Sequence, residues 1–326
     1  MSMIRIFDLN WTQCIPTMVC TNRKLRIFRH YMLVPWYARA GATILVVAVL
    51  SFLQGADEIK HVDALTSKDS ILNQVFVKMG WAWTLLAFLV LTLSLLPLSP
   101  QPLNASIKMA LRALLLTIIF YTWCAVIFPS IEHYTGMCLS NNVVVSRHDK
   151  KKCLKSGHKF DSFDISGHAF LMVYCVLTIM QEAQTMRRYM ALGQGIGKLN
   201  ENPDAGNANV QGNSTMTKEN AQNLLASDQP KSSEDINKVA SSPVQENLEA
   251  LPDSEVIKFQ ATYMRLWPIV SIAYVGVCVL CVMWDIVLVI TTIYYHTLSE
   301  KLLGISIAAS SFAFLYKYLF IKLNLL

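Results

Sequence analysis

Residues 79–98 read MGWAWTLLAFLVLTLSLLPL, a run of twenty residues without a charged side chain. A helix rises about 1.5 Å per residue, so about 20 apolar residues are needed to cross the roughly 30 Å hydrocarbon core of a bilayer. This stretch has the length and the composition of a transmembrane segment. It predicts one membrane-spanning helix.

Further apolar blocks of similar character flank this segment on both sides. They are residues 32–53, 109–128, 165–180, 266–293 and 302–320. Hydrophobic residues make up 53% of the 326 residues and charged residues only 15%. This balance is typical of a membrane protein rather than a soluble domain. The predicted fold is all-α, a polytopic membrane protein with six transmembrane helices.

An even number of spans places both termini on the same side of the membrane. Five basic residues precede the first span, namely Arg5, Arg23, Lys24, Arg26 and Arg29. Positive charge next to a span favours the cytosolic side. We therefore predict that residues 1–31 form a cytosolic N-terminal segment and that loops 54–78, 129–164 and 294–301 face the lumen.

The composition changes between residues 192 and 252, where Asn, Gln, Ser, Gly, Lys and Glu dominate. Such a segment buries too little apolar surface to offset the entropy of ordering it. We predict a disordered cytosolic linker over 192–252. It separates spans one to four, within 32–191, from spans five and six, within 253–326.

The loop 129–164 is strongly basic although it is predicted to be lumenal. Its basic residues include Arg147, Lys150, Lys151, Lys152, Lys155 and Lys159. Two explanations stay open at this point: either the orientation is inverted, or the cluster binds phosphate groups. Cys138 and Cys153 bracket part of this loop, and an oxidising lumen would favour a disulfide between them.

Two histidines lie at span ends, where polar groups are costly and therefore functional candidates. His168 begins span four in FDISGHAF, residues 163–170, and His296 follows span five. Because one linker joins these two spans, their other ends share a membrane face in either orientation. One imidazole can attack phosphorus while the other protonates the departing oxygen, so the pair predicts phosphoryl transfer.

Three neighbouring residues complete the predicted site. Glu300 follows His296 by four residues, which on a helix would put both on one face, and a carboxylate there would orient the imidazole. Ser166 and Gly167 stand at a helix start, where backbone amides bind anions. Structural alternatives remain: Ser166 as an N-cap, Glu300 as a capping residue and each histidine as an interfacial side chain. Asp285, inside span five, is expected to pair with another span.

The segments KSGHKFD (155–161), FDISGHAF (163–170) and YYHTLSEKLLG (294–304) on six spans resemble the fat storage-inducing transmembrane (FIT) family. That family is similar to the lipid phosphate phosphatases, which share a Ser-Gly-His motif and a later His-x-x-x-Asp. The resemblance implies a lipid phosphate phosphatase-like core and an acyl-CoA diphosphatase of the endoplasmic reticulum. Such a hydrolase cleaves long-chain acyl-CoA to acyl 4′-phosphopantetheine and adenosine 3′,5′-bisphosphate and supports lipid droplet formation.

The resemblance also implies roles for individual residues. The catalytic set is His168, which protonates the leaving group, His296, the nucleophile, and Glu300 in place of the phosphatase aspartate. The Ser-Arg that precedes the nucleophile in the phosphatases is replaced here by Val289 and Ile290. Phosphate binding is therefore assigned to Ser166 and Gly167 together with the loop lysines, which are Lys150, Lys151, Lys152 and Lys155.

The expected location is the endoplasmic reticulum membrane, with both termini cytosolic and the active site lumenal. The expected partners are long-chain acyl-CoA and membrane lipids, with di- and triacylglycerol implied by the resemblance. We expect no cofactor, no metal and no nucleic acid. Two other functions remain open: a phosphatase acting on phosphatidate or lysophosphatidate, and a non-enzymatic scaffold that binds di- or triacylglycerol. A transporter is disfavoured because the two halves contain no matched pair of broken helices.

Overall fold

The computed structural model describes residues 30–55, 77–99, 101–140, 143–147, 150–187, 189–190, 193 and 253–326. The predicted N-terminal segment and the predicted linker lie almost entirely outside these ranges. The chain divides into two compact units. Unit 1 comprises 1–34, 91–102 and 182–278, and unit 2 comprises 35–90, 103–181 and 279–326. Each unit is described separately.

Six helices in the described part of the chain are long and apolar enough to cross a membrane. They are Trp36–Gln54, Gly80–Leu98, Pro102–Thr135, Gly167–Arg187, Gln260–Tyr294 and Leu298–Lys322. Every apolar block of the sequence falls largely within one of them. The predicted six-span helical membrane fold is confirmed.

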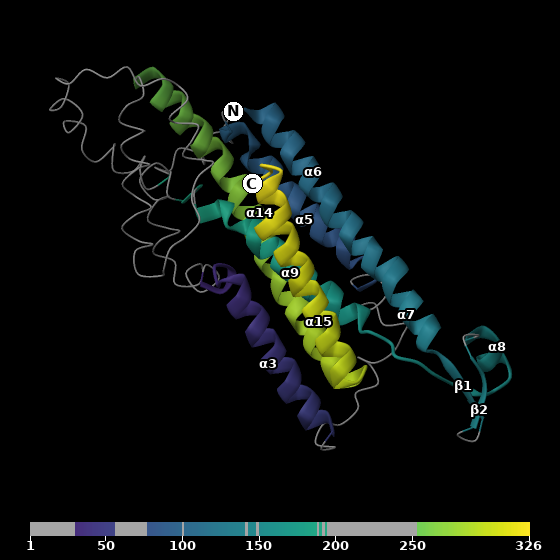
Figure 1. Cartoon of the computed structure of the whole chain (residues 1–326). Helices are drawn as coiled ribbons and strands as arrows, with labels where there is room; N and C mark the ends of the chain where they lie inside the picture. The colour runs from purple at the N-terminus through teal and green to yellow at the C-terminus, as the bar shows by residue number, and fades with distance from the viewer. Residues whose placement is uncertain are drawn as a thin grey trace, which may run out of the picture. The chain divides into compact units, whose positions relative to one another are not determined.

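Figure 1 labels the main helices of these spans. The first three spans consist of α3 (Trp36–Gly55), α5 (Gly80–Leu95) with η2 (Leu96–Leu98), and α6 (Pro102–Tyr121) continued by the π-helix η3 (Thr122–Ile127) and α7 (Phe128–Thr135). The last three consist of α9 (Gly167–Ala183), α14 (Asp253–Tyr294), and α15 (Leu298–Ala313) continued by the π-helix η5 (Phe314–Leu319) and α16 (Phe320–Lys322).

The segment between α7 and α9 is more structured than the predicted basic loop. It holds β1 (Met137–Ser140), β2 (Val143–Arg147), α8 (Lys150–Lys155) and β3 (Lys159–Asp161), and the strands form an antiparallel sheet in the order β2-β1-β3. The valine run of β2 favours a strand because β-branched side chains fit a pleated surface. Cys138 of β1 and Cys153 of α8 form a disulfide. The expected all-helical chain therefore carries one small sheet, outside the membrane spans.

Helix α9 supplies the core of unit 2. Phe170, Met172 and Tyr174 are completely buried along it. The Tyr174 hydroxyl donates to the Leu116 carbonyl of α6 over 3.0 Å, and the Phe170 ring lies 5.3 Å from that of Phe128 at the start of α7. A helix that is apolar on all sides is expected at the centre of a bundle. This packing fixes the position of the first turn of α9.

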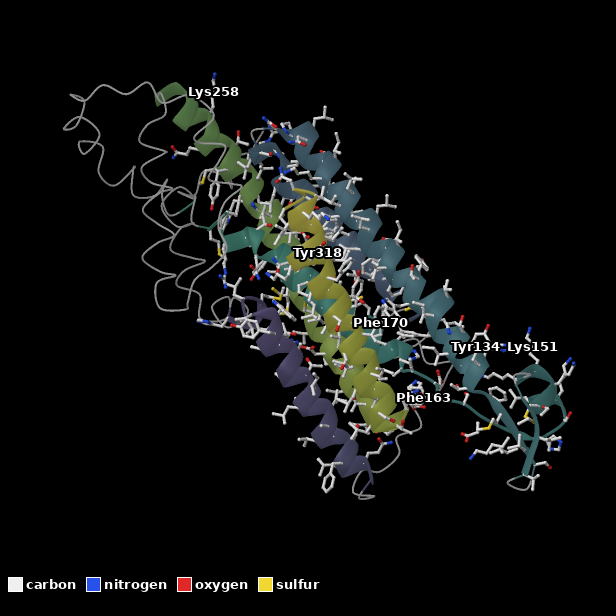
Figure 2. The ribbon with its side chains drawn as sticks, viewed as in Figure 1. Tyr134, Lys151, Phe163, Phe170, Lys258 and Tyr318 are labelled. Atoms are coloured by element: carbon white, nitrogen blue, oxygen red, sulfur yellow. A yellow bond between two sulfur atoms is a disulfide. The ribbon has the colours of Figure 1, made fainter. Side chains whose placement is uncertain are left out.

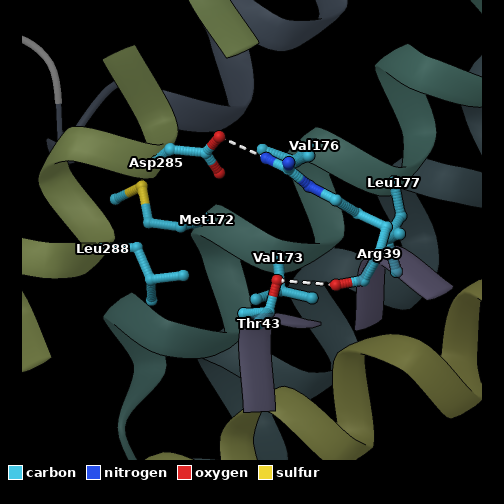
Figure 3. Close-up of a pocket in the computed structure, with 8 residues that line it drawn as sticks. All are labelled: Arg39, Thr43, Met172, Val173, Val176, Leu177, Asp285 and Leu288. Atoms are coloured by element: carbon cyan, nitrogen blue, oxygen red, sulfur yellow. Dashed lines mark hydrogen bonds and ion pairs between the residues drawn. The ribbon is translucent and has the colours of Figure 1, made fainter. Parts of the chain in front are cut away.

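An ion pair joins two spans inside unit 2. Arg39 of α3 donates to Asp285 of α14, and Figure 3 shows the pair beside the apolar side chains of Met172 and Leu288. The expected pairing of Asp285 with another span is confirmed. Thr43 Oγ1 bonds the Arg39 carbonyl over 2.9 Å in the same place. Charged groups inside a membrane bundle are tolerated when they are paired in this way.

In unit 1, three aromatic side chains stack where α9 continues toward residue 190 and α14 begins. The ring of Tyr189 lies 4.5 Å from that of Tyr263 and 5.8 Å from that of Trp267. Tyr189 also donates its hydroxyl to the Tyr263 carbonyl over 3.3 Å. These contacts hold together the segment before the predicted linker, which contains Tyr189, and the segment after it, which contains Tyr263 and Trp267.

Candidate active site

His296 lies in the turn between α14 and α15. Helix α14 ends at Tyr294 and α15 begins at Leu298. His296 has a positive φ of 61°, a left-handed conformation that is uncommon for a residue other than glycine and that is often found at functional sites. The expectation that His296 and Glu300 share one helical face is wrong, because His296 precedes the N-cap residue Thr297 and lies outside the helix.

Glu300 nevertheless contacts His296 from the first turn of α15. Its Oε2 lies 3.6 Å from His296 Nδ1 and accepts the Thr297 amide over 2.8 Å in a capping box. Its Oε1 accepts the amide of Asp164 over 3.2 Å. Glu300 therefore caps α15 and places a carboxylate oxygen beside the imidazole, while its role in orienting His296 stays a prediction.

Ser166 connects the start of α9 to the same place. Its amide donates to the Glu300 carbonyl over 3.3 Å, and its buried hydroxyl accepts the Ala169 amide over 3.2 Å. The hydroxyl thus acts as the N-cap of α9. The Phe170 amide also bonds the Ser166 carbonyl. Phosphate binding by Ser166 and Gly167 at this helix start stays a prediction.

The close approach of α15 to this turn depends on a glycine. A Cβ atom on Gly304 would lie 2.6 Å from the Ser166 carbonyl oxygen and 3.4 Å from the Phe170 nitrogen. Only a residue without a side chain lets the two backbones meet at this distance. Gly304 therefore sets how closely the turn that carries His296 approaches the helix that carries His168.

The two histidines come together at this point. His168 is exposed in the first turn of α9, two residues after Ser166, whose amide bonds the carbonyl of Glu300. His296 is more enclosed, with 17% of its side chain exposed. The structure thus places both imidazoles on the side where α9 begins and α14 ends, as the connectivity requires.

Asp164 is a site residue that the sequence analysis did not select. Its Oδ2 lies 4.0 Å from His296 Nδ1, so two carboxylates face this nitrogen. Partial burial raises the pKa of Asp164, and the negative charge of Glu132 raises it as well. The positive charges of His296 and Lys150 act in the opposite direction and lower this pKa. Asp164 belongs to the quoted FDISGHAF segment, two residues before Ser166, and its nearness to the motif was the available signal.

The four candidate lysines occupy one short helix, α8. Lys150 forms an ion pair with Glu132 of α7 and lies 5.9 Å from the centre of the Phe160 ring. Its charge also acts on Asp164. The others, Lys151, Lys152 and Lys155, are exposed on α8, which lies beyond the end of α7, as the position of Lys151 in Figure 2 illustrates. Lys150 is thus held against α7 through Glu132, near the segment that carries Asp164.

In this arrangement His296 Nδ1 lies near the two carboxylates, so the other ring nitrogen, Nε2, is the one that can react. An imidazole held in this way is a stronger nucleophile and is stabilised when it becomes positively charged. Over the described ranges, no group of three or more His, Cys, Asp or Glu side chains is arranged to hold a metal ion.

The fold defines a multi-pass membrane protein in which a histidine between two spans, His296, lies near the carboxylates of Asp164 and Glu300. The family model described as fat storage-inducing transmembrane protein matches residues 61–316. The chain belongs to the fat storage-inducing transmembrane family. No solved structure matches the chain.

The chain is also similar to several curated proteins named acyl-coenzyme A diphosphatase FITM2. The protein from Drosophila melanogaster is 28% identical over 252 residues, which cover 77% of this chain and 50% of that protein. The Homo sapiens protein is 38% identical over 130 residues, covering 37% and 48% of the two chains. The Xenopus laevis protein is 37% identical over 127 residues, covering 37% and 47%. The chain thus spans about half the length of the curated relatives it matches.

Proposed function

We propose that this protein is an acyl-CoA diphosphatase that hydrolyses long-chain acyl-CoA to acyl 4′-phosphopantetheine and adenosine 3′,5′-bisphosphate. The observation that carries the proposal is the contact between the start of α9, which carries His168, and the turn that carries His296: the Ser166 amide bonds the Glu300 carbonyl, and the carboxylates of Glu300 and Asp164 lie near His296 Nδ1. The name of the curated relatives, acyl-coenzyme A diphosphatase, supports the same substrate class.

In the proposed reaction, His296 Nε2 attacks one phosphorus of the pyrophosphate. A P–N bond forms and the P–O bond of the anhydride breaks, while His168 gives its proton to the departing phosphate oxygen. Neutral His168 then takes a proton from water, which attacks the phosphohistidine and breaks the P–N bond. One water molecule is consumed, and both histidines return to their starting protonation states.

The position of the site suits a substrate that is both anionic and apolar. The histidines lie where α9 begins and α14 ends, so an acyl chain can lie along apolar spans while the phosphates stay at the membrane surface. The amides of Gly167 and His168 at the start of α9 face this region, and Lys150 adds positive charge near Asp164. Lys151, Lys152 and Lys155 are proposed to attract the more distant phosphate of the coenzyme.

We further place the protein in the endoplasmic reticulum membrane, with both termini cytosolic and the site lumenal, where it supports lipid droplet formation. The disulfide between Cys138 and Cys153 supports this orientation, because disulfides persist in an oxidising compartment. The disulfide lies in the extramembrane segment that joins α7 to α9, on the same side as the histidines. Asn10 and Asn213 each begin an Asn-x-Ser/Thr sequence on the predicted cytosolic side, so glycan attached at either one in microsomes would reverse the assignment.

The experiment compares the wild type with His168→Ala and His296→Ala in detergent, using oleoyl-CoA and mass spectrometry of the products. His158→Ala is the matched control, since this histidine lies in the extramembrane segment between α8 and β3. We expect both site variants to lose activity by at least about 100-fold, the usual contribution of acid–base groups, with unchanged size-exclusion profiles. Equal hydrolysis in all four proteins would overturn the assignment of the site, and no hydrolysis in any of them would favour the non-enzymatic lipid-binding scaffold. Cleavage of phosphatidate alone would favour the phosphatase.

A further inference from the structure

Lys301 is a buried lysine in the first turn of α15, next to Glu300. Its side chain is 1% exposed, although the helix belongs to a membrane span. Its Nζ donates to Ser51 Oγ and Gln54 Oε1 of α3, both over 3.2 Å, and to the Thr292 carbonyl of α14 over 2.6 Å. A buried ammonium group is costly unless it is hydrogen-bonded, and here three acceptors surround it.

The Thr292 carbonyl is the contact with the most direct relation to the site. In a continuous helix this carbonyl would accept the amide of residue 296. Helix α14 ends at Tyr294 instead, and residue 296 is His296 in its left-handed conformation. The Lys301 ammonium group takes the place of that amide. A lysine at the end of a helix satisfies the last carbonyls and interacts favourably with the negative end of the helix dipole.

We infer that Lys301 is a positioning residue for His296, an inference that rests on the proposed function. Lys301 closes the end of α14 from which the turn with His296 departs. Glu300, its neighbour in the chain, holds the imidazole of the same histidine at 3.6 Å. Two consecutive residues of α15 thus fix His296, one through the backbone that precedes it and the other through its side chain.

A purely structural role for Lys301 makes a different prediction. If the lysine only tethered α3 to α15, removal of its acceptors on α3 would have the same effect as removal of the lysine. Replacement of Ser51 and Gln54 leaves the bond to the Thr292 carbonyl in place. The two sets of variants therefore separate positioning of His296 from tethering of α3.

The experiment compares Lys301→Met with the double variant Ser51→Ala/Gln54→Leu in full-length protein, using steady-state hydrolysis of oleoyl-CoA. For Lys301→Met we expect kcat to fall by about 100-fold, the loss that a misplacement of about 1 Å can cause, with KM changed less than threefold. For the double variant we expect less than a threefold change in kcat. Unchanged kcat in Lys301→Met, or an equal loss in both variants, overturns the inference.

A second measurement is independent of activity. The rate at which diethyl pyrocarbonate modifies His296 is followed by peptide mass spectrometry, with His168 as the internal reference. We expect Lys301→Met to change the His296 rate several-fold relative to His168, and no relative change overturns the inference. If wild type does not cleave acyl-CoA, the proposed function fails while this readout still tests the position of His296. If Lys301→Met gives no monodisperse protein, both measurements are made on Lys301→Gln instead. Its shorter amide side chain is expected to cause the same changes to a smaller degree. A Lys301→Gln variant that behaves like the wild type would overturn the inference.

Discussion

The Glu300 carboxylate lies between His296 and Asp164: Oε2 is 3.6 Å from the imidazole Nδ1, and Oε1 accepts the Asp164 amide over 3.2 Å. Its own backbone carbonyl accepts the amide of Ser166 over 3.3 Å. One residue of α15 thereby holds the turn with the proposed nucleophile against the segment that starts α9. The capping box and the site share this residue, so local helix formation and assembly of the site depend on each other.

Glu300→Gln is expected to separate these two roles. A glutamine at this position still closes a capping box, so the thermal stability should change little. The loss of the negative charge next to His296 Nδ1 removes the stabilisation of the imidazolium, and kcat should fall by about 100-fold, the lower end of general acid–base contributions. Steady-state kinetics and a thermal melt of the same preparation test this.

Glu300→Ala is the comparison for this prediction, since loss of the cap should cost about 1 kcal/mol of stability as well. Unchanged kcat in Glu300→Gln would remove Glu300 from the mechanism.

Asp164→Asn is expected to alter the pH dependence of stability. Burial raises the pKa of Asp164 above its value in the unfolded chain. The protonated carboxyl therefore favours the folded state, and this contribution is present at acidic pH and is lost as the pH rises through the raised pKa. Near pH 7 the ionised carboxylate is a cost that asparagine lacks. Thermal melts between pH 4 and pH 8 should show Asp164→Asn gaining stability over wild type as the pH rises.

The opposite trend for Asp164→Asn would also be informative. If the variant lost stability relative to wild type at neutral pH, the attraction between Asp164 and His296 would outweigh the cost of burial. The carboxylate is 55% exposed, so solvent screens the effect and the expected difference in melting temperature is small. Repeating the series in His296→Ala separates the two contributions, because the attraction is absent there.

Gly304→Ala tests the close contact between α15 and the start of α9. The added Cβ would meet the Ser166 carbonyl oxygen at 2.6 Å, so one of the two backbones must move. We expect a destabilisation of about 1–3 kcal/mol, as for other overpacked sites, together with a lower kcat because His168 and His296 move apart. Gly41→Ala is the matched control, since an added Cβ meets no atom within 4 Å there. Equal melting temperatures and equal kcat for both variants would contradict the proposed tight contact.

The sequence predicted the spans and the meeting of the two histidines for different physical reasons. Hydropathy is a local property, so blocks such as 79–98 identify spans without knowledge of their partners. The common membrane face of His168 and His296 follows from connectivity alone. The positive φ of His296, by contrast, arises from how the chain turns between α14 and α15, which spacing to Glu300 does not reveal.

Contacts between distant segments were the part that the sequence could not supply. Nothing in the sequence distinguishes Lys301 from the other lysines, because its contacts with Ser51 and Gln54 of α3 are visible only in the structure. Asp164 becomes a site residue only because the bond from its amide to Glu300 brings it to His296. The sequence does not predict the sheet after α7, because the short valine run of β2 lies within a basic, polar stretch that is typical of a loop. These features depend on tertiary packing, which a single sequence does not encode by pattern.

The ion pair between Arg39 and Asp285 provides a test of the membrane core itself. The side chains are only 16% and 32% exposed, and they join α3 to α14 beside apolar side chains of α9 (Figure 3). Loss of one side chain takes this ion pair away from the other, so Arg39→Met or Asp285→Leu alone should cost about 3–5 kcal/mol, as for other buried pairs. The double variant should be more stable than either single variant, because no charge remains. Unfolding of the four proteins in mixed micelles measures the coupling. Additive losses would show that the two residues act independently and that packing, not charge, holds α3 in place.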